Sequence, residues 1–340
     1  MDILITGGAG FLGARLAREL LARGQLSLAG SPAQNITTIT LVDRAPPPAD
    51  IAADSRIRAV TGDLNALLMQ DPTRGALVQE HHQLIVHLAA AVSGECEADF
   101  DLGMRSNLDA TRALLEACRR LSATPTFVFA SSLAVFGNSA EQPLPPVIDD
   151  RTLPTPQNSY GIQKFIGEQL VADYARKGFI RGRNVRLMTV SVRPGKPNGA
   201  ASGFLSGMIR EPLAGIRAVC PVPRETAVAL SSPARSTEGL IRSMEATDGE
   251  WGARTAINLP AITTTVREMA EALERVAGKE AAALIDWTPD AAVARIITSW
   301  PSRFDARRAR SLGLQPDADF EAIIRAHLSE NPRTQAGGPQ

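Results

Sequence analysis

Residues 3–13 read Ile3-Leu4-Ile5-Thr6-Gly7-Gly8-Ala9-Gly10-Phe11-Leu12-Gly13, an apolar run followed by a glycine-rich turn. The turn opens an amphipathic segment, Phe11–Ala22, so this order predicts a strand, a loop and a helix. Small residues let a backbone approach a pyrophosphate, and a helix N-terminus offers unpaired N–H groups and a positive dipole end. We therefore assign the phosphates of a dinucleotide to this loop; a tight turn without a ligand is the alternative. The residues assigned to it are Gly7, Gly10, Phe11, Leu12 and Gly13.

Short apolar runs alternate with helical patterns through the first half of the chain. Such alternation is typical of a parallel sheet covered by helices on both faces. The sequence predicts an α/β fold, with a Rossmann-type doubly wound parallel sheet in residues 1–194 that carries the catalytic residues. Residues 195–330 are predicted to form mainly a smaller C-terminal substrate-binding lobe and lid, and residues 331–340 a disordered tail. The predicted strands are Asp2–Thr6, Ile39–Asp43, Ile57–Thr61, Leu84–Ala90, Thr126–Ser131 and Val185–Val192, with a short strand Ala256–Leu259 in the lobe; further predicted helices are Asn107–Leu121, Gly203–Ile209, Thr265–Val276, Asp290–Ser299 and Phe320–Leu328.

The composition excludes several classes of protein. The chain has 340 residues with 36 basic and 36 acidic side chains, so no basic surplus indicates nucleic acid or an anionic membrane as a partner. The three cysteines and four histidines are not spaced as metal ligands, and we expect neither a metal site nor a disulfide framework. No apolar run approaches the roughly 20 residues that a membrane span needs. Because no targeting pattern precedes the first strand, we expect a cytoplasmic protein.

The carboxyl ends of the predicted strands carry further residues suited to a cofactor. Ligands of open α/β sheets lie at these ends. Asp43 can accept both hydroxyls of an adenosine ribose and would repel a ribose phosphate, which favours NAD over NADP, although Arg44 could accommodate that phosphate. A simple strand end is the alternative for Asp43. Asp63-Leu64 could contact the adenine, or Asp63 could cap the next helix. The small residues of Leu88-Ala89-Ala90 would let the cofactor lie against the backbone.

A tyrosine and a lysine four residues apart give the main catalytic signal. Tyr160 and Lys164 begin a predicted helix, and their spacing places both side chains on one face. A phenol has a pKa near about 10, and a nearby ammonium favours its ionised form, so Tyr160 can exchange a proton with an alcohol. Ser132 ends the preceding strand and can hold the substrate oxygen opposite Tyr160. Local turn chemistry is the alternative for one serine of the pair Ser131-Ser132.

Together these motifs resemble those of the extended short-chain dehydrogenases/reductases, also described as NAD-dependent epimerases and dehydratases. The resemblance covers nearly the whole chain. It implies that Ser132 is the catalytic serine, that Tyr160 is the acid/base, and that Lys164 is its partner and a ligand of the NAD ribose. It also implies that Asn107 organises the helix behind the site, and that Val192 and Pro194 lie near the nicotinamide. The residues that carry it are the glycine loop, Asp43, Gly62-Asp63-Leu64, Leu88-Ala89-Ala90, Asn107, 131–137, Tyr160, Lys164 and Val192-Arg193-Pro194.

Departures from the family pattern narrow the reaction. Dehydratases of this family carry an Asp-Glu pair after the catalytic hydroxyl, where this chain has Leu133-Ala134, so dehydration is not expected. The run Arg193–Phe204 resembles that of family members that oxidise four-carbon sugar acids. This resemblance implies NAD-dependent oxidation of the 2-hydroxyl of D-erythronate to 2-oxo-erythronate. A cation should hold the substrate carboxylate, and we expect it among Lys196, Arg210 and Arg235.

Two other functions stay open at this point. A nucleotide-sugar epimerase with tightly bound NAD would use the same residues, whereas an NAD-sensing scaffold would not need the catalytic set. The alternative interpretation of the run 193–204 is a glycine-rich lid loop whose sequence does not indicate the substrate. Asn107–Leu121 and Gly161–Ala175 carry apolar residues, and the family pairs these helices, so a homodimer is predicted; burial inside the monomer is the competing explanation. These apolar residues include Leu115, Phe165, Ile166 and Leu170.

Overall fold

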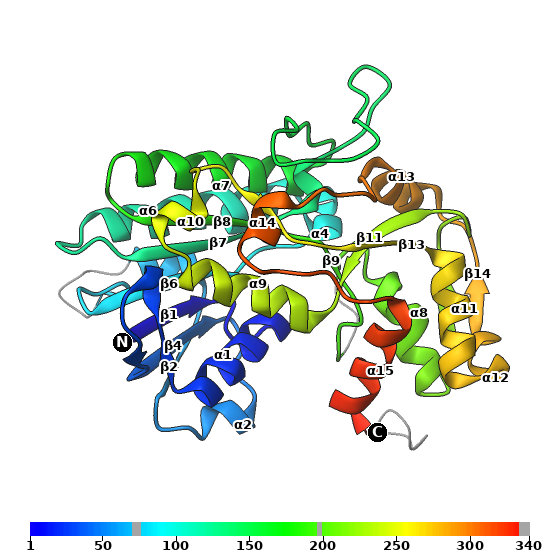
Figure 1. The fold of residues 1–340 in the computed structure, drawn as a ribbon, viewed down its shortest axis with the longest axis horizontal. Coiled ribbons are helices and arrows are strands. Elements are labelled where there is room, and N and C mark those ends of the chain that lie inside the picture. The colour runs from blue at the N-terminus through cyan, green and yellow to red at the C-terminus, as the bar shows by residue number, and fades with distance from the viewer. Residues whose placement is uncertain (70–75, 196–198, 333–340) are drawn as a thin grey trace.

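A seven-stranded sheet forms the centre of the computed structural model, which describes residues 1–69, 76–195 and 199–332 (Figure 1). Its strand order is β12-β8-β7-β6-β1-β4-β5, and every neighbouring pair is parallel. The order reverses at β1, which lies between β4 and β6, so the predicted doubly wound sheet is confirmed. The strands are β1 (Asp2–Thr6), β4 (Thr38–Asp43), β5 (Ile57–Thr61), β6 (His82–His87), β7 (Thr126–Ser132), β8 (Arg181–Leu187) and β12 (Ile257–Asn258).

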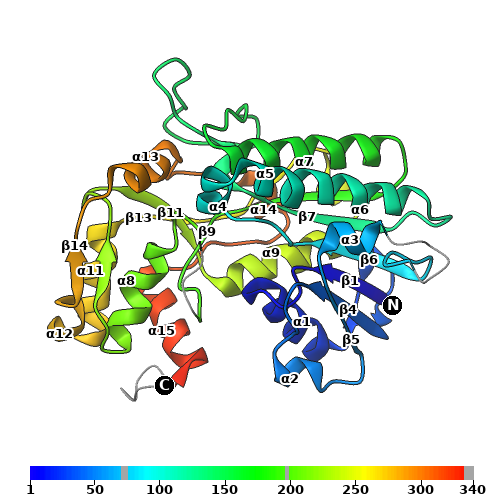
Figure 2. The same cartoon turned by 180° about the vertical axis from the view of Figure 1, so that it is seen from behind.

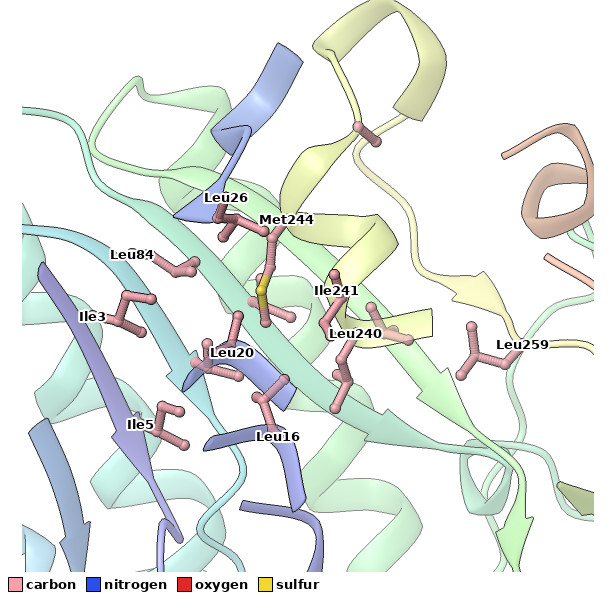
Figure 3. Close-up of a cluster of buried hydrophobic side chains, with 14 of the residues drawn as sticks. Ile3, Ile5, Leu16, Leu20, Leu26, Leu84, Leu240, Ile241, Met244 and Leu259 are labelled. Atoms are coloured by element: carbon pink, nitrogen blue, oxygen red, sulfur yellow. The ribbon is translucent and has the colours of Figure 1, made fainter. Parts of the chain in front are cut away.

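Helices cover both faces of this sheet (Figures 1 and 2). Successive side chains of β1 alternate between the faces, as the period of a strand requires. Leu4 belongs to the hydrophobic cluster that includes Leu114 of α6, whereas Ile3 and Ile5 belong to the cluster with Leu16 of α1 (Figure 3). The helices on the Leu4 face include α3 (Leu64–Leu68), α6 (Ala110–Arg119) and α7 (Ser159–Arg176), and those on the other face include α1 (Phe11–Arg23) and α9 (Pro233–Glu245).

Several predicted elements differ from the structure at their ends. β6 ends at His87 rather than Ala90, and a π-helical turn, Met104–Asp109, precedes α6 where one helix was predicted over Asn107–Leu121. The strand predicted over Val185–Val192 is divided. β8 belongs to the central sheet and ends at Leu187, and β9 (Thr189–Val190) pairs with β11 (Ala227–Ser231) in a smaller sheet. The chain therefore passes from one sheet to the other at Met188.

The helix α9 was not predicted, and its placement changes the division of the chain. Ser232 caps its N-terminus and Pro233 occupies its first turn, a start signal that was present in the sequence. Leu240 and Ile241 of α9 belong to the same hydrophobic cluster as Ile3 and Ile5 of β1 (Figure 3). In addition, β12 pairs with β8 and forms an edge strand of the central sheet. Residues 233–259, which fall within the predicted lobe 195–330, therefore contribute side chains to the core of the first part of the chain.

The remaining elements form the C-terminal lobe and the connections. The lobe has its own hydrophobic cluster, which joins α8, β11, α11 and α15. No helix in the described ranges combines the length and apolarity needed to span a membrane. Lobe elements are α8 (Phe204–Leu213), β10 (Ala218–Cys220), β11 (Ala227–Ser231), β13 (Ile262–Thr265), α11 (Val266–Ala277), α12 (Lys279–Ala282), β14 (Ile285–Trp287), α13 (Ala291–Ser299) and α15 (Phe320–Glu330). Connecting elements are β2 (Gln25–Leu26), η1 (Leu28–Gly30), β3 (Gln34–Asn35), α2 (Ala49–Ala52), α4 (Ser93–Ala98), α5 (Phe100–Gly103), η4 (Leu133–Val135), α10 (Asp248–Trp251) and α14 (Arg307–Ser311).

Candidate active site

The glycine loop joins β1 to α1, and two of its glycines leave no room for a side chain. Gly7 has a φ of 71°, and a Cβ there would lie 2.7 Å from the backbone nitrogen of Ala89. A Cβ on Gly13 would lie 2.1 Å from the Gly7 carbonyl oxygen. Gly10 precedes α1 without a side-chain cap, so the first N–H groups of the helix stay available to a ligand. The loop thus fits the pyrophosphate cradle that the sequence predicts.

Two cavities meet at this loop and form one cleft along the carboxyl ends of the strands. Gly7, Gly10, Leu88 and Ala90 line both cavities. The first is also lined by Asp43, Asp63, Leu64 and Ala89, and the second by Phe11, Leu12, Gly13, Ser132, Tyr160 and Lys164. The structure therefore brings into one cleft every residue predicted for catalysis, and all of those predicted for the cofactor except Asn107, Val192 and Pro194.

Asp43, Asp63 and Glu95 are the carboxylates that line the first cavity within the described chain, and the first two were predicted to bind the cofactor. Asp43 accepts hydrogen bonds at Oδ2 from the backbone nitrogens of Ala9 (3.0 Å) and Gly10 (3.2 Å), and so supports the glycine loop. Asp63 caps α3 by accepting from the nitrogen of Ala66 at 3.2 Å, which is the second of the two roles predicted for it. This bond and the contact with Arg44 at 3.2 Å hold the pKa of Asp63 below its usual value. A carboxylate at position 43 agrees with NAD.

His87 lies in a buried chain of hydrogen bonds beneath the cofactor cleft. Its Nε2 lies 2.9 Å from the hydroxyl of Thr111, and that hydroxyl donates its own proton to the carbonyl of Asn107. Nε2 therefore carries the ring proton, and Nδ1 accepts from the hydroxyl of Thr6 at 2.6 Å. The Thr6 oxygen also accepts from the nitrogen of Ala89, at 3.3 Å. A neutral His87 thus connects the end of β6 to β1 and α6.

Acid is expected to destabilise the protein through His87. Burial lowers the pKa of His87 to about 3 from 6.5. Below pH 6.5 the unfolded chain binds a proton that the folded chain does not, so stability falls as the pH falls from about 6.5 toward about 3, by up to about 1.4 kcal/mol per pH unit. Urea unfolding across this range should show a shallower pH dependence for His87→Gln, while His81→Gln, at an exposed position, keeps the wild-type slope. An unchanged slope in His87→Gln would contradict a neutral buried ring.

The three catalytic candidates are placed by the end of β7 and the first turn of α7. Ser132 is the last residue of β7, and its Oγ accepts from the nitrogen of Ala134 at 3.1 Å. Asn158 caps α7 by accepting from the nitrogen of Gly161 at 2.8 Å. A Cβ on Gly161 would lie 2.0 Å from the Ala134 carbonyl oxygen, so only glycine lets α7 start this close to the end of β7. Tyr160 and Ser132 reach the same cavity for this reason.

Burial controls the charges of Tyr160 and Lys164. Burial raises the pKa of Tyr160 to about 12, against the opposing effect of its hydrogen bond with Ser132. Burial also lowers the pKa of Lys164 to about 8. The ammonium of Lys164 donates to the Ala130 carbonyl at 2.9 Å and lies 5.8 Å from the centre of the Tyr160 ring. Tyr160 is therefore a protonated phenol in this structure, and it needs added positive charge nearby to act as a base.

Asn107 supports the site from behind, as the family resemblance implies. Its Oδ1 accepts from the nitrogen of Ala91 at 2.8 Å, and its Nδ2 donates to the carbonyl of Ala91 at 3.1 Å. Nδ2 also lies 2.8 Å from Oε1 of Gln163 on α7. Asn107 lines neither cavity, so its role here is to join the segment after β6 to the catalytic helix rather than to contact the cofactor.

A buried ion pair lies beside the catalytic residues and was not predicted. Glu168, one turn after Lys164 on α7, accepts two bonds from Arg186 at 2.8 and 2.7 Å. It also accepts from the hydroxyl of Ser131 at 2.5 Å. Both charged side chains are almost fully buried, at 6% and 2% exposure. The four-residue spacing from Lys164 was a signal for Glu168, but nothing local pointed to Arg186 on β8.

Several residues predicted to bind the cofactor or substrate lie elsewhere. Val192 is buried in the hydrophobic cluster of the lobe, and Pro194 is exposed; neither lines the cleft. Arg210 donates to the Arg193 carbonyl and pairs with Glu211, and Arg235 pairs with Glu238, so both are taken up by contacts away from the cavity. Lys196 lies outside the described residues. The cation that the structure places in the second cavity beside Lys164 is Arg193.

The chain is similar to proteins of known family over nearly all of its length. A model of the NAD dependent epimerase/dehydratase family matches residues 3–223. A D-erythronate dehydrogenase of Cupriavidus necator is 50% identical over 97% of this chain and 98% of its own, and one of Haemophilus influenzae is 41% identical over 96% and 99%. A solved nucleoside-diphosphate-sugar epimerase of Agrobacterium tumefaciens is 40% identical, with a TM-score of 0.86 over 98% of this chain and 95% of that one.

The likeness in fold extends further than the likeness in sequence. The L-threonine 3-dehydrogenase of Trypanosoma brucei superposes with a TM-score of 0.81 at 23% identity, covering 98% of each chain. These matches agree with the doubly wound parallel sheet described above. They confirm the predicted family and its NAD cofactor: the chain belongs to the NAD-dependent epimerase/dehydratase family of extended short-chain dehydrogenases/reductases.

Proposed function

We propose that the chain oxidises the 2-hydroxyl of D-erythronate to 2-oxo-erythronate with NAD. The proposal rests on one cavity. Ser132, Tyr160 and Lys164 all line it, and no Asp, Glu or His of the described chain does. Dehydration needs a second acid or base at the substrate, and the positions after Ser132 hold the buried Leu133 and Ala134 instead. Two relatives named D-erythronate dehydrogenase, 50% and 41% identical, support the choice of substrate.

The cleft residues divide the chemistry among them. Bound NAD supplies a hydride acceptor and a positive ring charge. The Ala134 nitrogen donates to Ser132 Oγ, and the serine hydroxyl, which also hydrogen-bonds with Tyr160, would donate its proton to a substrate oxygen placed between the two side chains. Tyr160, ionised with the help of the neighbouring charges, takes the hydroxyl proton as the C2 hydrogen leaves with its electron pair. Lys164, held by the Ala130 carbonyl, keeps its ammonium near the phenol and stabilises the ionised form.

NADH absorbance tests this function directly. Purified protein with NAD and a panel of four-carbon sugar acids should form NADH with D-erythronate, and little with the threonates or with NADP. Absence of NADH with every acid would overturn the proposal. Epimerisation of a nucleotide sugar without net NADH would then favour the second candidate, which the 40% identity to a solved nucleoside-diphosphate-sugar epimerase supports.

We also propose a homodimer in the cytoplasm, acting in sugar-acid breakdown. The side chains of Ile162 and Ile166, four residues apart on α7, are 45% and 37% exposed, an apolar stripe that a second copy could cover. Leu115 and Leu170 do not take part in this stripe, because both pack in the cluster beneath α6 and α7. Sedimentation equilibrium should give twice the chain mass; a monomer at micromolar concentration would contradict the proposal.

A further inference from the structure

Arg193 is a cation in the second cavity, the substrate half of the cleft, and it forms no ion pair with a carboxylate of the described chain. Lys164 and Arg193 are the cations that line the second cavity, and no Asp or Glu of the described chain lines it. Arg193 Nε donates to the Val190 carbonyl and Nη2 to the Ser202 hydroxyl, both at 3.0 Å. Nη1 has no hydrogen-bond partner within the described ranges. Both hydrogens of Nη1 and the second hydrogen of Nη2 are thus available to a ligand.

The backbone of Arg193 is held at both polar groups by one helix. Its N–H donates to the hydroxyl of Ser206 at 3.0 Å, and its carbonyl accepts from Arg210 Nη1 at 2.8 Å. Ser206 and Arg210 are four residues apart on α8 and so lie on the same face. Arg210, predicted from sequence to bind the substrate, is therefore a positioning residue for Arg193. The guanidinium itself is held from β9 and from Ser202.

These contacts fit a ligand with a carboxylate. A planar guanidinium with two free donor positions matches a carboxylate in two parallel bonds, and a half-buried site strengthens such bonds. Arg193 lines the same cavity as Ser132 and Tyr160 and does not line the first cavity with Asp43 and Asp63, so it lies at the catalytic end of the cleft. In a 2-hydroxy acid the carboxylate and the reacting hydroxyl are on neighbouring carbons.

We propose that Arg193 binds the substrate carboxylate through Nη1 and Nη2, and that it thereby selects 2-hydroxy acids over neutral alcohols. This assignment rests on the proposed oxidation of a sugar acid at the same site. Among the predicted carboxylate ligands, it takes the place of Arg210 and Arg235, which are engaged elsewhere. The carboxylate held by Arg193 and the hydroxyl held by Ser132 and Tyr160 together fix which carbon is oxidised.

The test compares Arg193→Met and Arg193→Lys with the matched control Arg235→Met, whose side chain pairs with Glu238 and lines neither cavity. Arg193→Met should raise KM for D-erythronate about 100-fold, because two charge-assisted hydrogen bonds are lost, and should leave the Kd for NAD within about twofold. Arg193→Lys keeps the positive charge but loses the two parallel donors of the guanidinium, so its KM should lie between those of wild type and Arg193→Met. Equal KM values in Arg193→Met and Arg235→Met would overturn the assignment.

A binding measurement separates this inference from the proposed function. Glycolate, the smallest 2-hydroxy carboxylate, is titrated calorimetrically into the complex with NADH, beside ethylene glycol as its neutral counterpart. Wild type and Arg235→Met should bind glycolate, and Arg193→Met should not. Should wild type fail to oxidise D-erythronate while glycolate binding still depends on Arg193, the proposed function fails and the carboxylate site stands. Oxidation with glycolate binding that is independent of Arg193 overturns the site alone.

Discussion

Replacement of Tyr160 by phenylalanine is expected to lower kcat for D-erythronate about 10³-fold while NAD still binds. Among the described residues that line the second cavity, the phenol is the group that can take the hydroxyl proton, because Lys164 is engaged with the Ala130 carbonyl and the Ser132 hydroxyl is not a base at neutral pH. Phenylalanine keeps the ring and loses the proton acceptor. Stopped-flow NADH formation, with calorimetric titration of NAD, measures both quantities.

Tyr174→Phe provides the matched control, since the chain has two tyrosines. Tyr174 lies near the C-terminal end of α7, where its hydroxyl donates to Glu116 of α6. It lines neither cavity, so its loss should leave kcat unchanged. If Tyr160→Phe retained wild-type kcat, Tyr160 would not be the acid/base, and another base would have to take the hydroxyl proton. Loss of NAD binding in the same variant would instead assign Tyr160 mainly to the cofactor.

Replacement of Glu168 by glutamine should lower the free energy of unfolding by about 3–5 kcal/mol, the cost of leaving a buried charge unpaired. Arg186 and Glu168 are both almost fully buried, and Lys164 lies one turn away, so the variant leaves two cations without a nearby carboxylate. Ser131 would also lose a charged acceptor. Chemical denaturation at pH 7 measures the change.

Two further variants test the physical reason. Glu168→Gln combined with Arg186→Met removes both charges and should recover most of the lost stability. Glu19→Gln breaks an exposed pair with Arg23 on α1 and should cost less than about 1 kcal/mol. A double variant as unstable as Glu168→Gln alone would show that the hydrogen bond to Ser131, rather than the uncompensated charge of Arg186, dominates.

Local patterns predicted the parts of the fold and site that depend on neighbouring residues. The strand, loop and helix of residues 2–23 follow from alternation, glycine spacing and helical period, and the structure has them within one residue. Tyr160 and Lys164 share a helix face, and Ser132 ends the strand before it, so their meeting needed only the parallel fold. These are contacts that chain order and strand direction determine.

The cation of the substrate pocket could not be predicted in this way. Arg193 was visible in the Val192-Arg193-Pro194 motif, yet its direction depends on the Val190 carbonyl, on Ser202 and on a helix that holds its backbone. Charge alone made Arg210 and Arg235 equally good candidates. The adjacent Glu211, and Glu238 one turn after Arg235, were the sequence signals that both arginines already had partners.

Because α9 and β12 follow the first lobe elements in sequence but pack on the central sheet, the order in which the chain leaves the ribosome affects its folding. In a nascent chain that has emerged only to residue 194, Val128 and Val185 have no α9 against them, and the edge of β8 has no β12. The nucleotide-binding half therefore cannot close its core on the ribosome until Asn258 has emerged, by which time the lobe strands β10 and β11 have emerged as well. A gene split at residue 194 would yield two fragments that each expose apolar surface, so the half that holds NAD is not a transferable module.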